Sequence, residues 1–264
     1  MVTNGNANVY NGTFVGGDQG IRASNNDLVC GAAASYCLKV CGGTANIYNG
    51  IFGSAVRKDQ NGNYIVEGSN VSSSGAFIMG TSADSRGTAN IYNGTFNVAG
   101  QSAFAVYKYA TVTFGQQGVD SDIYVRGLAA GITVEIANEP VYNNGSLLYQ
   151  YNNNRDRYAV VRRLIDTGIE LNIYDGEFRA YRNNGGDGIW FGNTRAGYAT
   201  TNIYGGEFYG ETRYGLNIEG GTVQCSEGTF YGTQGAISGN YTLASGSTAV
   251  NDFVNGYRVI RITN

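Results

Sequence analysis

The 264-residue sequence contains no histidine and only one proline. Without histidine, a His-based catalytic triad, proton transfer through imidazole and a His-ligated metal site are all excluded. No apolar run approaches the roughly 18 residues that suggest a membrane-spanning helix. The net charge is −3 and the arginines are scattered, which gives no basic stripe for nucleic acid. We therefore expect no nucleic-acid partner, no membrane insertion, no metal and no cofactor.

Glycine and tyrosine, in contrast, are abundant. The chain has 41 glycines and 21 tyrosines, while proline is nearly absent. The glycine share is about twice the usual 7% and follows no triplet period, so it indicates many tight turns and not a collagen helix. Tyrosine favours half-buried positions in strands. The composition is therefore typical of an all-β protein with many corners.

One eight-residue phrase, Ala-Asn-Val-Tyr-Asn-Gly-Thr-Phe in its first copy, recurs along the chain. Its copies occupy residues 7–14, 45–52, 89–96, 171–178 and 201–208, and a degenerate sixth copy occupies 223–230. Repetition at this scale means that each unit cannot bury its own apolar face and stacks on its neighbours to do so.

Within the phrase, polar and apolar residues alternate as in a strand with one buried face. The predicted inward column is Val9, Ile47, Ile91, Ile173, Ile203 and Cys225. The predicted outward columns are Asn8, Asn46, Asn90, Asn172 and Asn202 on one side, and Tyr10, Tyr48, Tyr92, Tyr174 and Tyr204 on the other. An Asn-Gly corner follows, since these residues tolerate a left-handed backbone. Inward-pointing Phe14, Phe52, Phe96, Phe178, Phe208 and Phe230 come next.

A second, apolar phrase precedes the first and ends in a Gly-Gly-Thr turn, as in residues 36–44 and 214–222. The shortest repeat, from Phe208 to Phe230, is 22 residues, the size of one turn of a β-solenoid. Regular coils are expected in residues 1–100 and 168–240. Residues 101–167 should hold looser coils with a protruding loop near 138–157. Within 101–167, only residues 122–124 resemble the phrase. Residues 248–264 should form a C-terminal strand segment.

This repeated order of strands and glycine turns resembles the repeats of the right-handed parallel β-helix proteins. That superfamily includes pectate lyases, polygalacturonases, phage tailspikes and many bacterial adhesins. The Gly-rich repeats are most similar to those of large secreted surface proteins of bacteria. The resemblance implies a single all-β domain over 1–264, a right-handed parallel β-helix of about 8–10 coils. Pectinolytic members carry a Gly-His-Gly segment with Asp clusters, or Arg with calcium-binding Asp residues. Neither set is complete in this sequence, so no catalytic residue is carried over.

The best catalytic candidates are Glu177 and Glu207, which occupy one column on neighbouring copies of the phrase. Stacked strands hold such residues about 4.8 Å apart, and paired carboxylates at about 5 Å occur in retaining glycosidases. The alternative is a permissive surface column, because the equivalent residues are Thr13, Ile51, Thr95 and Thr229. Arg179 and Arg182 also lie close enough to neutralise the pair.

The Tyr and Asn columns are the best binding candidates. Stacked aromatic residues form a rigid amphipathic strip, and the asparagines supply amide donors and acceptors. Such a strip suits a polysaccharide or a second solenoid, and a purely structural Tyr ladder is the alternative. The candidate residues are Tyr10, Tyr48, Tyr92, Tyr174, Tyr204, Asn46, Asn90, Asn172 and Asn202.

The four cysteines do not form a metal pattern. Cys225 stands in the inward column and is expected to be buried and free. Cys37 and Cys41 are expected to point outward, roughly 13 Å apart, which is too far for a mutual bond. A bond from Cys30 to either one would imply an oxidising compartment.

Together these patterns predict an extracellular or surface-displayed structural and adhesive protein. Because the ends of a β-solenoid expose unpaired backbone groups, and both terminal segments of this chain are strand-like, self-association head to tail into a fibre is expected. The alternatives are a polysaccharide lyase or glycoside hydrolase working in a groove, and a trimeric receptor binder like a phage tailspike.

Overall fold

The computed structural model describes residues 2–14, 36–53, 56–58, 60, 64–66, 74–98, 103–106, 109–127, 142–143, 146–147, 157–162, 168–180, 186–191, 199–218 and 220–264. These residues form strands, bridges and turns, and no helix occurs among them. Consequently no helix in these ranges could cross a membrane. The prediction of an all-β protein is confirmed.

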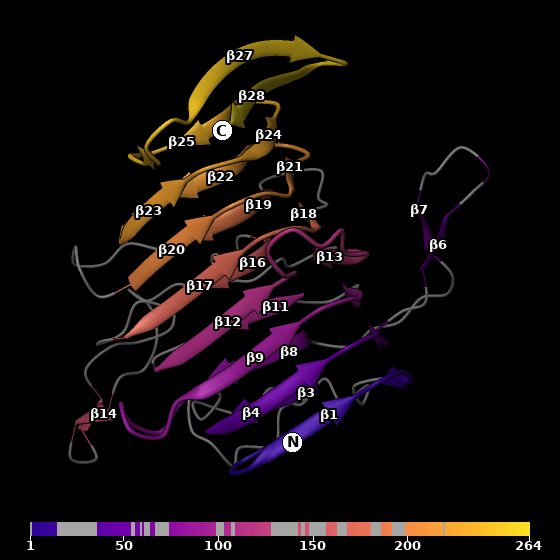
Figure 1. Ribbon diagram of the computed structural model, residues 1–264, viewed down its shortest axis with the longest axis vertical. Coiled ribbons are helices and arrows are strands. Elements are labelled where there is room, and N and C mark those ends of the chain that lie inside the picture. Colours follow the sequence, from indigo (N-terminus) through magenta and orange to yellow (C-terminus); the bar gives the residue numbers. More distant parts are fainter. Residues whose placement is uncertain are drawn as a thin grey trace.

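Three long sheets run along the molecule (Figure 1). The sheet that carries the Tyr column, here called the Tyr sheet, is ordered β1 (Asn6–Val9), β4 (Gly43–Ile47), β9 (Gly87–Ile91), β12 (Ala110–Phe114), β17 (Ile169–Ile173), β20 (Ala199–Ile203), β23 (Thr222–Cys225) and β26 (Thr242–Leu243). The Phe sheet is ordered β2 (Thr13–Phe14), β5 (Ile51–Gly53), β10 (Gly94–Val98), β13 (Ile123–Gly127), β18 (Glu177–Ala180), β21 (Glu207–Gly210), β24 (Gly228–Gly232), β28 (Tyr257–Thr263) and β27 (Thr248–Val254). The third sheet is ordered β25 (Gly235–Ser238), β22 (Tyr214–Ile218), β19 (Gly186–Phe191), β16 (Arg157–Arg162), β11 (Phe104–Val106), β8 (Ser74–Met79) and β3 (Tyr36–Cys41).

The chain visits the three sheets in a constant order, from the third sheet to the Tyr sheet to the Phe sheet. This order holds for β3, β4 and β5, then for β8, β9 and β10, and again through β22, β23 and β24. We call each such passage a rung. Successive rungs pair in parallel, so equivalent residues of the phrase become neighbours in register. Parallel pairing also rules out a hairpin at the Asn-Gly corner, where Gly12, Gly50 and Gly94 have φ values of 146°, 149° and 132°.

The predicted inward columns form the core. Ile47, Ile91, Ile173, Ile203 and Cys225 are at most 1% exposed, and Val9 in the first rung is half-buried. The phrase phenylalanines stack face to face, with ring centroids 4.5 to 5.2 Å apart, in the series Phe14, Phe52, Phe96 and in the series Phe178, Phe208, Phe230. Stacking within one buried column removes large apolar areas from water.

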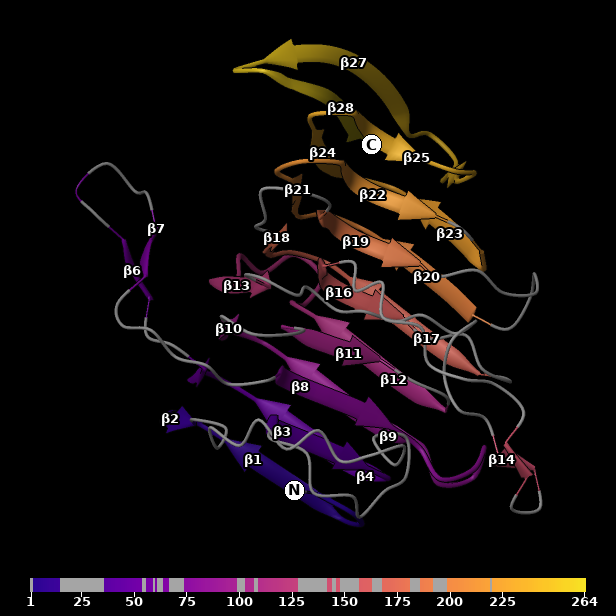
Figure 2. The ribbon, with the colours of Figure 1, turned by 180° about the vertical axis from the view of Figure 1, so that it is seen from behind.

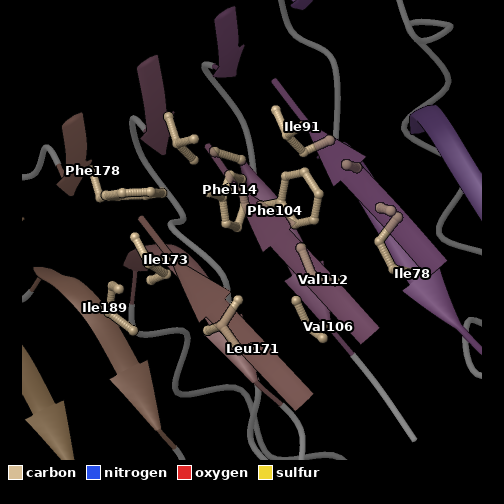
Figure 3. Packing of buried hydrophobic residues seen from close by; sticks show 14 of the residues in the cluster. Ile78, Ile91, Phe104, Val106, Val112, Phe114, Leu171, Ile173, Phe178 and Ile189 are labelled. Atoms are coloured by element: carbon tan, nitrogen blue, oxygen red, sulfur yellow. The ribbon is translucent and has the colours of Figure 1, made fainter. Parts of the chain in front are cut away.

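The Phe column is interrupted, which corrects the expectation of one continuous stack. Val125 of β13 stands in register between Phe96 and Phe178. Correspondingly, Phe114 of β12 stands in the Ile column between Ile91 and Ile173 (Figure 3). Reading residues 122–124 as an echo of the Tyr-sheet strand is therefore wrong. That strand is β12, and residues 123–127 belong to the Phe sheet.

An antiparallel hairpin ends the Phe sheet near the C-terminus (Figure 1). Strand β28 pairs antiparallel with both β24 and β27. Its Val259 and Ile262 are 1% and 2% exposed, so β28 covers the last rung. The outer strand β27 is exposed along most of its length.

Two further hairpins lie outside the three sheets. Strands β6 (Val56–Lys58) and β7 (Tyr64–Val66) pair antiparallel and project away from the stack (Figure 2). Strands β14 (Tyr142–Asn143) and β15 (Ser146–Leu147) pair likewise. They fall within the loop predicted near residues 138–157, most of which lies outside the described residues.

The thiols differ from expectation in part. Cys225 is buried and free, as predicted, and burial raises its pKa to about 12. Cys37 and Cys41 are not surface thiols, because Cys41 is buried and Cys37 packs against the core. Cys30 lies outside the described residues, so a bond to it stays a prediction.

Candidate functional site

The outward side of the Tyr sheet, here called the Tyr face, carries three columns of residues in register. The first is Asn6, Thr44, Thr88, Thr111, Glu170, Thr200 and Thr222. The second is Asn8, Asn46, Asn90, Thr113, Asn172, Asn202 and Gln224. The third is Tyr10, Tyr48, Tyr92, Gly115, Tyr174, Tyr204 and Ser226. Glu170 is the single charged residue in these columns, and the Arg86 guanidinium donates to the Thr111 hydroxyl of the first column at 3.0 Å. One negative and one positive group leave the face close to neutral.

The tyrosines of this face stack on one another. The ring centroids of Tyr10 and Tyr48, and those of Tyr48 and Tyr92, are 5.0 Å apart, with interplanar angles of 9° and 13°. Tyr174 and Tyr204 stack at 4.6 Å and 9°. Because each ring covers the face of the next, the stack presents ring edges and phenolic hydroxyls to solvent. The apolar ring faces are open only at the ends of a stack.

Exposure varies along the column. Tyr10, Tyr48 and Tyr204 are 70%, 40% and 38% exposed, whereas Tyr92 and Tyr174 are half-buried. The expectation that all of these rings are exposed is therefore met only in part. Partial burial, the neighbouring Tyr174 and the carboxylate of Glu170 together raise the pKa of Tyr204.

The asparagine column is a hydrogen-bonded ladder. The Asn46 amide donates to Asn8 at 2.9 Å, and the Asn90 amide donates to Asn46 at 2.8 Å. In the later rungs Asn202 donates to Asn172 at 2.9 Å. Each such bond uses one N–H and one oxygen lone pair, so a ladder amide keeps another N–H and another lone pair for a ligand. The ladder orients these remaining groups alike from rung to rung.

The sequence reasoning missed two properties of the face. The column of threonines lies beside the Asn and Tyr columns, and the Gly-Gly-Thr turn that precedes several phrases could have identified it. Both ladders are also interrupted in the rung of β12, where Thr113 replaces Asn and Gly115 replaces Tyr. The face therefore holds two separate Tyr stacks.

Glu177 and Glu207 lie side by side on the outer side of the Phe sheet, as Cα partners of β18 and β21. Their carboxylates are engaged differently. Glu177 forms an ion pair with Arg179, whose guanidinium also contacts Glu211 at 2.9 Å. Glu207 accepts hydrogen bonds from Tyr209 at 2.8 Å and from Tyr231 at 3.5 Å. Each acid is therefore engaged by its own partners within the Phe sheet.

These two glutamates belong to a cluster that the sequence reasoning did not identify. Tyr209 and Tyr231 stack with centroids 4.3 Å apart, and the Arg179 guanidinium lies 3.7 Å from the Tyr209 ring centroid. Tyr257 of the C-terminal hairpin donates to Glu211 at 2.9 Å. Burial raises the pKa of Tyr209, and burial with the Glu211 contact raises that of Tyr257 to about 12. The cluster fastens the hairpin to the Phe sheet. In the sequence, the repeated Phe-Tyr-Gly of β21 and β24 marks two of its members, Tyr209 and Tyr231.

Within the described ranges, no group of three or more His, Cys, Asp or Glu side chains is arranged to hold a metal ion. In comparisons with known proteins, no family model, no curated protein and no solved structure matches this chain. The geometry of the chain itself is therefore the basis for a functional proposal.

Proposed function

We propose that residues 1–264 form a single right-handed parallel β-helix and that the protein is an extracellular structural and adhesive molecule that binds neutral polysaccharide on its Tyr face. The constant visiting order of the three sheets and the parallel register support the β-helix. This architecture repeats one surface along its length, which suits a polymer that also repeats.

The observation that carries the binding proposal is the Tyr face itself. Its Tyr, Asn and Thr columns stand in register on successive strands, at a spacing of about 4.8 Å, and they present hydroxyl and amide groups without net charge. Since the ring faces are covered within each stack, the tyrosines contribute edges and hydroxyls, and hydrogen bonds from the free amide groups hold the sugar hydroxyls. A face with so few charged groups favours an uncharged polymer.

A binding role is favoured over an enzymatic one by the state of the two glutamates. Glu177 is paired with Arg179, and Glu207 accepts hydrogen bonds from two tyrosines. A retaining glycosidase uses one carboxyl group as proton donor and a second as nucleophile, and here both candidates are already engaged by side chains of the same sheet. The Tyr face needs no such chemistry, because binding requires no proton transfer.

Retention on insoluble cellulose, chitin and starch tests the proposal. The parent protein should be retained by at least one of these polymers, and the double variant Tyr48→Ser/Tyr204→Ser should lose most of that retention. Phe253→Ser is the matched control, since Phe253 is an exposed aromatic residue, 69% exposed, on strand β27 of the Phe sheet. No retention of the parent on any of the three polymers, or equal loss in the control, would overturn the proposal.

A further inference from the structure

The Tyr face is interrupted at one corner, between β12 and β13. Eight residues, Gly115–Asp122, connect the register positions Phe114 and Ile123. In the preceding rung the equivalent positions are Ile91 and Gly94, and only Tyr92 and Asn93 connect them. The segment Gly115–Asp122, here called the corner loop, is thus an insertion of six residues into the repeat.

The rungs on both sides hold the corner loop in place. Asn93 of the preceding rung accepts a hydrogen bond from the Asp122 N–H at 2.8 Å. Asp175 of the following rung accepts one from the Ser121 N–H at 2.7 Å. Within the loop, the Val119 N–H donates to the Gln116 carbonyl at 3.1 Å, which closes a tight turn. These bonds make the loop a fixed part of the surface.

The corner loop takes the place of a tyrosine. Gly115 has φ 75°, and a Cβ built there would lie 3.0 Å from the Asp175 nitrogen and 3.3 Å from the Ser121 hydroxyl. A side chain at this point of the Tyr column would be strained by the left-handed backbone and would press on Asp175 and Ser121. Val119 at the loop tip is 51% exposed, and residues 116–120 are all exposed.

The rings beside the corner loop differ from the other rings of the face. Tyr92 and Tyr174 each lack one ring neighbour, because Gly115 stands between them. Both are half-buried, whereas Tyr48 and Tyr204 are 40% and 38% exposed. The two rings next to the interruption are therefore less accessible to a ligand than these.

We infer that the corner loop determines specificity by dividing the Tyr face into two short binding tracts. This inference rests on the proposed function. A linear glycan that follows the ladder from Tyr10 is stopped beyond Tyr92, and a second one is confined to Tyr174 and Tyr204. The face therefore recognises short stretches or ends of a neutral glycan and gains nothing from a longer chain.

Soluble oligosaccharides of increasing length, prepared from whichever of cellulose, chitin and starch retains the protein, test the inference by calorimetry. With the parent protein, affinity should rise with length and then reach a plateau once one tract is filled. In a variant where Tyr-Asn replaces residues 115–122 and Ile123→Gly restores the corner glycine, the Tyr ladder is continuous, while Thr113 stays in the Asn column. Its affinity should keep rising, by tenfold or more beyond the parent plateau, since linked contacts act together.

The outcomes are distinguishable. If the parent is retained by a polymer but its affinity rises with length without a plateau, the inference is wrong and the proposed function stands. The inference is also wrong if the loop-free variant is shown by circular dichroism to be folded and its affinity levels off at the same oligosaccharide length as in the parent. If the parent binds none of the polymers, the proposed function fails and the inference with it. Should the variant not fold, the oligosaccharide length at which the parent reaches its plateau still decides, because a tract of two or three rungs is filled by a shorter chain than the whole face would be.

Discussion

Neighbouring rungs fill the same core with different residues. In the rung of β9 and β10 the Tyr sheet contributes Ile91 and the Phe sheet contributes Phe96. In the next rung the equivalent residues are Phe114 and Val125. The large ring has moved from one sheet to the other, and all four residues are completely buried. These two neighbouring rungs therefore fill nearly the same volume, to within one methylene group, although the residue in a given column changes.

The exchange also changes how the rings meet. Phe96 contacts Phe104 of the third sheet at 5.1 Å and 69°, and Phe104 contacts Phe114 at 4.9 Å and 68°. Phe114 then contacts Phe178 at 5.1 Å and 85°. Edge-to-face contacts thus connect the two parallel Phe stacks across the rung of β11, β12 and β13, here called the exceptional rung. Figure 3 shows this for the residues from Phe104 to Phe178. The aromatic core is continuous although the Phe column is not.

The largest effect should come from removing a ring in a regular rung. Phe96→Ala leaves a cavity in the middle of a stack and should cost about 3–5 kcal/mol of unfolding free energy. Val125→Ala at the equivalent position of the next rung should cost clearly less, because less volume is removed. Urea unfolding measures both, and Phe253→Ala serves as the exposed control, expected to stay within about 0.5 kcal/mol of the parent. Equal losses at Phe96 and Val125 would contradict the idea of exchanged volume.

A reciprocal swap tests the exchange directly. Phe114→Ile empties the core of its rung and Val125→Phe overfills it, so each should cost about 1–3 kcal/mol. The double variant restores the residues of a regular rung and should be more stable than the sum of the two losses predicts, by about 0.5–3 kcal/mol. A double-mutant cycle from urea unfolding gives this coupling. Strict additivity would show that the two positions do not share a volume.

Much of this architecture was predictable from residue patterns. The inward Ile and Phe columns, the Asn-Gly corners and the third apolar strand all follow from alternation and from glycine, because every regular rung repeats them. The exceptional rung was misread because β12 lacks the Asn, Tyr and corner residues of the phrase, so only its in-register pairing identifies it. The cluster of Tyr209, Tyr231 and Tyr257 with its acidic partners was missed for another reason. The repeated Phe-Tyr-Gly marks Tyr209 and Tyr231, but no local spacing places Tyr257 of the C-terminal hairpin beside them.

The attachment of the corner loop to the following rung should depend on one carboxylate, that of Asp175. Asp175 accepts the Gly176 N–H with one oxygen and the Ser121 N–H with the other, each at 2.7 Å. Asp175→Asn replaces one acceptor with a donor, so one bond is lost and about 1 kcal/mol of stability with it. Asn11→Asp is the matched control, because Asn11 accepts only the Gly12 N–H and its regular corner carries no loop. Thermal unfolding should show a lower midpoint for the first variant and little change for the second.

The smallest expected effect concerns the ionisation of the Tyr stack after the exceptional rung. Burial first, then Tyr174 and Glu170, raise the pKa of Tyr204 above its ordinary value of 10.0. Glu170 stands where the regular rungs have threonine, so Glu170→Gln should lower this pKa. Because the chain has 21 tyrosines, an NMR titration of the assigned Tyr204 ring in the parent, Glu170→Gln and the distant control Asp252→Asn measures it. Because the folded state holds this proton more tightly, the stabilisation is complete below pH 10 and is lost as the pH rises through the folded-state pKa. An unchanged Tyr204 titration in Glu170→Gln would show that the carboxylate does not reach the stack, and that the rungs on either side of the corner loop are electrostatically alike.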